Sequence, residues 1–128
     1  MLKLRLVLTS ADWDSEKIVA KAGLNPTRKW ARGDRVHPKA TNLEKENGCL
    51  VEVTGASLSS AAGDLLRILE PTKLHREPLP KEIEVEFSCI VYMEDGAPEL
   101  HMDQQFVRFA AQLGASIDFD VYEMREPA

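Results

Sequence analysis

The chain has 128 residues, of which 44% are hydrophobic and 29% charged, and it carries a net charge of −5. This composition fits one folded domain over residues 1–128 and excludes a disordered chain. The acidic balance argues against nucleic-acid binding, which needs a basic surface. No apolar run is long enough for a signal peptide or a membrane span, so we expect a cytoplasmic protein that does not contact membranes.

The first predicted element is a strand over residues 2–9, because leucine alternates there with charged or smaller residues. A helix is expected over residues 15–22. Asp14 is suited to cap its free amides, and Gly23 is a natural left-handed stop.

Residues 27–48 are polar and rich in charge. They predict at most a weak strand at 35–40, and Asn47-Gly48 is typical of a turn. An apolar strand at 49–54 follows this segment.

The next helix has the clearest periodicity in the chain, since leucine or alanine recurs at helical spacing over residues 58–69. Ser57 is its predicted cap, and Pro71 ends or breaks it. A long strand is expected over residues 83–93, where apolar and polar residues alternate.

The last helix is predicted after Asp103 and ends at Gly114. A final strand over residues 116–122 follows it after a very short connection. We expect the apolar residues of this strand to face the core, and these are Ile117, Phe119 and Val121.

Each predicted strand has one apolar and one polar face, whereas a strand covered on both sides reads as a continuous apolar run. The sequence therefore predicts an α+β fold with a single, mostly antiparallel sheet and three helices on one face. The element order suggests a ferredoxin-like sandwich with an added helix–strand unit. The short last connection favours a parallel crossover between the two C-terminal strands.

Three groups of short motifs occur in order along the chain. They are Ala22-Gly23-Leu24-Asn25-Pro26, then Trp30-Ala31-Arg32-Gly33-Asp34, then Leu113-Gly114-Ala115 with Ile117-Asp118-Phe119-Asp120-Val121-Tyr122. Over nearly the whole chain they resemble the domain of unknown function 4279 family. The resemblance implies a small bacterial cytosolic protein and supplies no activity and no catalytic residues. Because some similar proteins lie near polymorphic-toxin loci, it also suggests an immunity role.

The first candidate site is the exposed face of the sheet, where the outward positions hold five acids and two bases. An acidic face of this kind suits a basic protein partner, such as the cationic cleft of a nuclease toxin. The alternatives are an ordinary solvated face and a metal shared by Asp118 and Asp120. The outward residues are Lys3, Arg5, Glu52, Glu84, Glu86, Asp118 and Asp120.

The second candidate site is the basic segment 28–39, which concentrates cations in an otherwise acidic chain. Arg28, Trp30, Arg32 and Arg35 are suited to hold an anion or a partner. The alternative is a structural loop that Trp30 anchors to the core while the cations stay in water.

No catalytic or metal-binding pattern is evident. His37, His75 and His101 are scattered, and the serines lack a nucleophile elbow. Cys49 and Cys89 lie in strands without a CxxC spacing, so we expect two buried thiols and no structural metal. The alternative is a disulfide between them, if they face each other on neighbouring strands. No cofactor is implied.

We therefore expect a non-enzymatic protein-interaction module with an unidentified protein partner. One rival is a ligand-binding domain or small enzyme with a pocket near the Trp30 loop. The other is a structural module that forms a homodimer through the sheet face or an edge strand.

Overall fold

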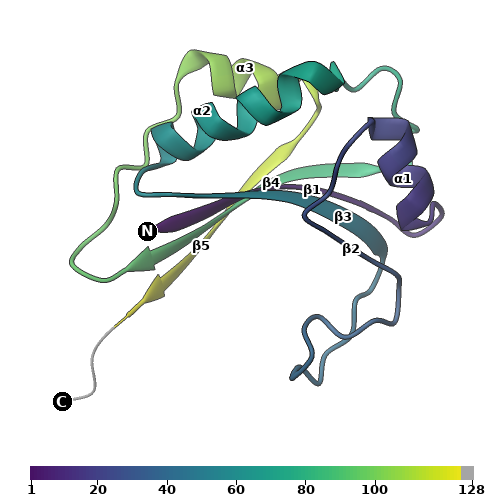
Figure 1. Cartoon of the computed structure of the whole chain (residues 1–128), viewed down its shortest axis with the longest axis horizontal. Helices are drawn as coiled ribbons and strands as arrows, with labels where there is room; N and C mark the ends of the chain where they lie inside the picture. Colours follow the sequence, from purple (N-terminus) through teal and green to yellow (C-terminus); the bar gives the residue numbers. More distant parts are fainter. Residues whose placement is uncertain (125–128) are drawn as a thin grey trace.

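The computed structural model describes residues 1–124, and it forms one five-stranded sheet whose three helices all lie on the same face (Figure 1). The predicted α+β class is therefore confirmed. The elements in chain order are β1 (Leu2–Ser10), α1 (Ser15–Ala22), β2 (Arg28–Trp30), β3 (Asn47–Gly55), α2 (Leu58–Leu69), the 3₁₀ turn η1 (Glu70–Thr72), β4 (Glu84–Met93), α3 (Gln104–Gln112) and β5 (Ser116–Glu123).

The strand order across the sheet is β2-β3-β1-β4-β5, which places the N-terminal strand at the centre. β1 runs antiparallel to both β3 and β4, and β5 runs parallel to β4. The predicted parallel crossover through α3 is thus confirmed. The ferredoxin-like comparison is not confirmed, because β4 and β5, which α3 connects, lie side by side, whereas a ferredoxin-like split βαβ unit has another strand between such a pair.

The core lies between the sheet and the helices. It is built by the strands, in which every second side chain is buried against the helices. All four even-numbered leucines of β1 are buried. Leu6, for example, lies opposite Val51 on β3 and Phe87 on β4. Phe87 in turn meets Phe106 of α3 edge to face, with ring centroids 4.9 Å apart. The core thus ties α3 to the centre of β4.

All three helices begin at the residues that the sequence predicts as caps. The side chains of Asp14, Ser57 and Asp103 accept hydrogen bonds from backbone amides in the first turns of α1, α2 and α3. These bonds satisfy amides that a helix leaves free at its N-terminus. No helix within residues 1–124 has the length and apolar character needed to cross a membrane.

The segment between α1 and β3 differs from the prediction. The weak strand expected at residues 35–40 is absent, and only an isolated bridge joins Arg35 to Leu43. The short edge strand β2 forms earlier, and Trp30 pairs with Gly48 of β3. Gly48 is a strand residue rather than a turn residue, because it pairs with Thr9 of β1 and Trp30 of β2. A Cβ atom there would lie 2.5 Å from the Trp30 ring, which is why the position needs a glycine.

The apolar face of β5 is less covered than the sequence suggests. Ile117 packs against the core, but Phe119 and Val121 are 38% and 56% exposed. The expectation that all three face the core is therefore wrong for the latter two. They point to the helical side of the sheet, but the helices leave this end of the edge strand uncovered.

The two cysteines are free, buried thiols on the core face of the sheet. Cys49 lies opposite Leu8 and Cys89 opposite Leu4, so the whole of β1 separates them. Burial raises the pKa of the Cys49 thiol to about 11. Neither cysteine therefore has the character of a reactive thiolate.

Candidate partner-binding face

The strand register brings the predicted acidic residues together on the face of the sheet that carries no helix, here called the open face. Arg5 lies opposite Glu52 on β3 and Ser88 on β4, and Ser88 lies beside Asp118 on β5. Directly opposite residues share a face. The same reasoning places all of the outward residues on the open face: Lys3, Arg5, Glu52, Glu84, Glu86, Asp118 and Asp120.

The two bases neutralise only one side of this face. Arg5 forms an ion pair with Glu52 at 2.6 Å. The Lys3 ammonium lies 6.0 Å from the centre of the Tyr92 ring. Within residues 1–124 no ion pair involves the remaining acids, which form the β4–β5 acidic cluster: Glu84, Glu86, Asp118 and Asp120.

Mutual repulsion is visible at the centre of this cluster. Burial raises the pKa of the Glu86 carboxyl above its ordinary value, and the charges of Asp118, Asp120 and Glu84 raise it further. Ionised Glu86 is therefore less favourable in the folded chain than in the unfolded one. A cation that docks on the open face relieves the repulsion among these carboxylates, so its binding is favoured.

Replacing Glu86 with glutamine should therefore raise the stability of the free protein at pH 7. Because the pKa of Glu86 is raised in the folded chain, ionised Glu86 destabilises the fold fully at pH values above the folded-state pKa. This destabilisation is lost as the pH falls below the pKa of the unfolded chain, where the carboxyl is protonated in both states. We expect a gain of up to about 1 kcal/mol at pH 7 that disappears near pH 3. Urea unfolding at both pH values measures it, with Glu77→Gln as a control away from the sheet. A gain of equal size at pH 3 would contradict this account.

A pair of tyrosines extends the acidic cluster toward the end of the sheet. The rings of Tyr92 and Tyr122 are stacked with centroids 5.9 Å apart, and Tyr122 is 53% exposed. Exposed aromatic rings beside acids suit the cations of a partner, because a ring face attracts guanidinium and ammonium groups. The predicted site residues do not include this pair, although the alternation of β5 places Tyr122 on the outward face.

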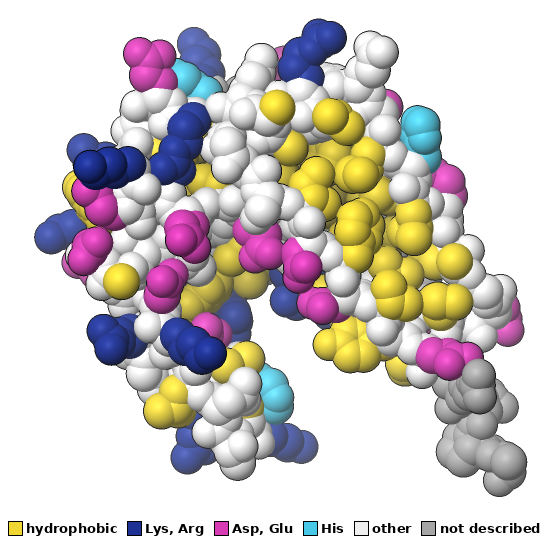
Figure 2. Space-filling view, turned by 180° about the vertical axis from the view of Figure 1, so that it is seen from behind, with side chains coloured by type: hydrophobic (Ala, Val, Ile, Leu, Met, Phe, Trp, Pro, Cys, Tyr) yellow, Lys and Arg dark blue, Asp and Glu magenta, His cyan; other side chains and the backbone are white. Residues whose placement is uncertain are grey.

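The open face is hollowed rather than flat. Figure 1 shows the loop of residues 31–46 projecting from the sheet on the side away from the helices. In Figure 2 this loop forms the lower left of the molecule, and acidic side chains line the roof of the hollow beside it. A partner can therefore enter a concave surface with acids at its centre.

Contacts among its own side chains and backbone hold the basic segment 28–39 in place. Trp30 is only 8% exposed, and the Arg28 guanidinium stacks over its ring at 4.6 Å. Arg28 also donates a hydrogen bond to the carbonyl of Val36 at 2.7 Å. These contacts anchor the basic segment 28–39 to the sheet through Trp30. Arg32 and Arg35 are exposed beyond the anchor, where they remain accessible to solvent.

The histidines do not assemble with a nucleophile. The Ser59 hydroxyl donates to the Glu99 carboxylate at 2.9 Å, and the backbone amide of His101 donates to the same oxygen at 2.6 Å. These bonds lower the pKa of Glu99 and fasten the loop before α3 to the start of α2. Within the described chain, no group of three or more His, Cys, Asp or Glu residues is placed to hold a metal ion.

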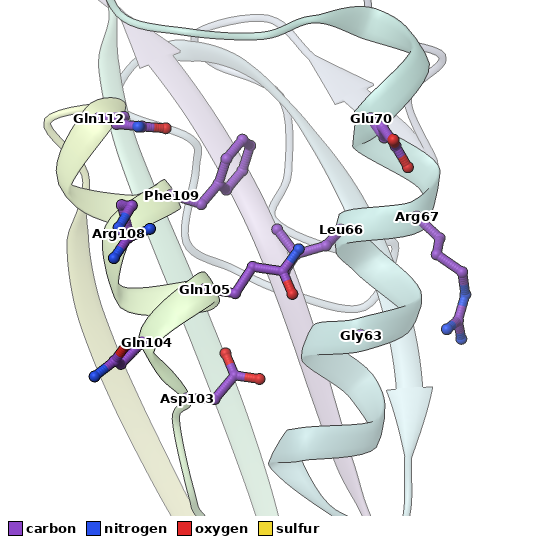
Figure 3. Close-up of a pocket in the computed structure, with 10 residues that line it drawn as sticks. All are labelled: Gly63, Leu66, Arg67, Glu70, Asp103, Gln104, Gln105, Arg108, Phe109 and Gln112. Atoms are coloured by element: carbon purple, nitrogen blue, oxygen red, sulfur yellow. The ribbon is translucent and has the colours of Figure 1, made fainter.

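A cavity lies on the other side of the sheet, between α2 and α3, rather than beside Trp30. Its volume is about 870 Å³. Figure 3 shows Gln105 reaching toward Leu66 across the groove, with Phe109 nearby and Arg67 pointing away. The lining combines amides and charges of both signs without a focus of one chemistry, so it indicates no ligand class.

Comparison with known proteins gives a family and no activity. The model of a domain of unknown function (DUF4279) matches residues 2–124, which includes every strand and helix described above. No curated protein and no solved structure matches the chain. Because the family match spans nearly the whole sequence, the chain belongs to the DUF4279 family.

Proposed function

We propose that this chain is a non-enzymatic protein-interaction module that docks a basic protein partner on its open face. The observation that carries the proposal is the β4–β5 acidic cluster, four carboxylates that form no ion pair within residues 1–124 and lie on a concave, uncovered sheet face. A partner that supplies the missing cations removes the repulsion around Glu86, so docking gains free energy that the free protein lacks.

The proposed partner chemistry follows from this charge. Acidic side chains gathered in one hollow speed the encounter with a positively charged surface, and they disfavour acidic competitors. Arginine fits best, because it pairs with carboxylates in two-pronged geometry and stacks on tyrosine rings such as Tyr122. An immunity role is one form of this function, in which the open face covers the cationic active site of a nuclease toxin.

Charge reversal on the open face tests the proposal. Tagged wild-type protein and the triple variant Glu84→Lys, Glu86→Lys, Asp118→Lys are used to capture partners from the native host at low salt. We expect a basic protein that the wild type retains and that the variant retains at least about tenfold less.

A matched control separates a specific face from overall charge. The variant Asp64→Lys, Glu70→Lys and Glu77→Lys changes the net charge by the same amount away from the open face. It should capture the partner as well as the wild type does. Equal losses in both variants, or no loss in either, would refute docking on the open face.

A further inference from the structure

The outer edge of β5 is an unprotected strand edge. β5 is the last strand of the sheet, and among residues 1–124 no strand pairs with its outer side. Natural edge strands are usually kept short, or interrupted by proline, lysine or a bulge. β5 has eight residues with neither proline nor lysine, and the charges that it does carry are acidic, so they repel an acidic strand but not a cationic one. Such an edge is suited to accept one more strand.

The two flanks of this edge differ in chemistry. The flank toward the helices presents Phe119 and Val121, both exposed. Figure 2 shows a patch of apolar side chains on one side of the molecule. The flank on the open face presents Asp118 and Asp120. An added strand therefore meets apolar side chains on one face and carboxylates on the other.

A second copy of the chain does not fit this edge. In an antiparallel two-fold pair centred on Asp118, that residue lies opposite itself, and a pair centred on Asp120 repeats the problem. A pair centred on Phe119 places Asp118 opposite Asp120 twice. Like charges directly opposite each other on a sheet are destabilising. The central registers are therefore disfavoured for a homodimer.

We propose that the edge of β5 binds an extended segment of the partner in which cationic and apolar residues alternate. This inference rests on the proposed function and names its mode of docking. Alternation at every second residue sends the cations to Asp118 and Asp120 and the apolar side chains to Phe119 and Val121. The sheet already contains such a cross-strand pair, since Arg5 meets Glu52 at 2.6 Å.

A synthetic peptide tests the pairing directly. The probe is an eight-residue peptide, Thr-Lys-Val-Lys-Val-Arg-Val-Thr, labelled for fluorescence anisotropy. A second version is N-methylated at two adjacent central residues, which removes backbone donors on both of its edges. The N-methylated version should bind at least about tenfold more weakly, because strand addition depends on main-chain hydrogen bonds.

Protein variants test the two flanks separately. Asp118→Lys with Asp120→Lys should weaken binding of the plain peptide at least about tenfold, and so should Val121→Lys. The control Asp64→Lys with Glu70→Lys should leave it unchanged. Circular dichroism confirms that each variant is folded.

The outcomes separate this inference from the proposed function. Equal affinity for the plain and N-methylated peptides overturns strand addition, while charge-dependent capture of a host partner still supports docking on the open face. An absence of peptide binding also overturns the inference. Sedimentation of a wild-type dimer that Val121→Lys dissociates overturns it in favour of a second copy on the same edge.

Discussion

Replacing Phe87 with alanine should lower the free energy of unfolding by about 3–5 kcal/mol, as for other buried aromatic residues. Phe87 is fully buried at the middle of β4, between Leu6 of β1 and Ile117 of β5. Its ring meets Phe106 at 4.9 Å and Phe109 at 6.2 Å. The substitution therefore opens a cavity where α3 packs on the sheet. Equilibrium unfolding in urea measures the loss.

Phe119→Ala is the matched control, because it removes the same side chain from the same side of the neighbouring strand. Phe119 is 38% exposed and lies outside the buried core. The expected loss is about 1 kcal/mol or less. Losses of similar size for the two variants would contradict the conclusion that the end of β5 is uncovered.

Replacing Trp30 with alanine should cost about 3 kcal/mol, at the lower end of the range for buried aromatic residues. The ring fills the space above Gly48, and Arg28 stacks on its outer face. Removing the ring empties the space above Gly48 and weakens the attachment of the edge strand β2 to β3. Thermal and urea unfolding both report the loss.

Two further variants show whether Trp30 anchors the loop or mainly binds a ligand. Trp30→Phe retains an aromatic ring and should recover at least half of the lost stability. Arg32→Ala, which changes an exposed side chain, should alter stability by no more than about 0.5 kcal/mol. Unchanged stability in Trp30→Ala would refute the anchoring role.

The main elements of the fold could be predicted because local physics decides them. Alternation in β1 and β4 and the helical repeat of α2 depend only on neighbours in sequence. The caps Asp14, Ser57 and Asp103 bond to amides three residues away, so the sequence alone predicts them. The one-sided helical layer followed from the polar second face of the strands.

The region around β2 could not be predicted, because distant residues determine it. Asn47-Gly48 has the composition of a turn, but the Trp30 ring occupies the space that a side chain at residue 48 would need. That contact joins residues 18 positions apart, and no local rule indicates it. Tertiary packing thus overrides turn propensity at this point.

The acidic part of the candidate site was predictable, whereas its borders were not. Alternation alone places Glu86 and Asp118 on the outward face, and the register confirms that placement. The exposure of Phe119 and Val121 depends on how far α3 extends over β5, which the apolar pattern does not encode. The register of β4 against β5 likewise brings Tyr92 and Tyr122 together.

Carboxyl footprinting of the complex tests the docking of a partner on the open face most directly. The protein is labelled with a carbodiimide and an amine, with and without the captured partner, and each modified side chain is quantified by mass spectrometry. We predict that the partner protects Glu84, Asp118 and Asp120 and leaves Asp64 and Glu70 equally reactive. Protection of Asp64 and Glu70 alone would place the partner on the helices and contradict the account.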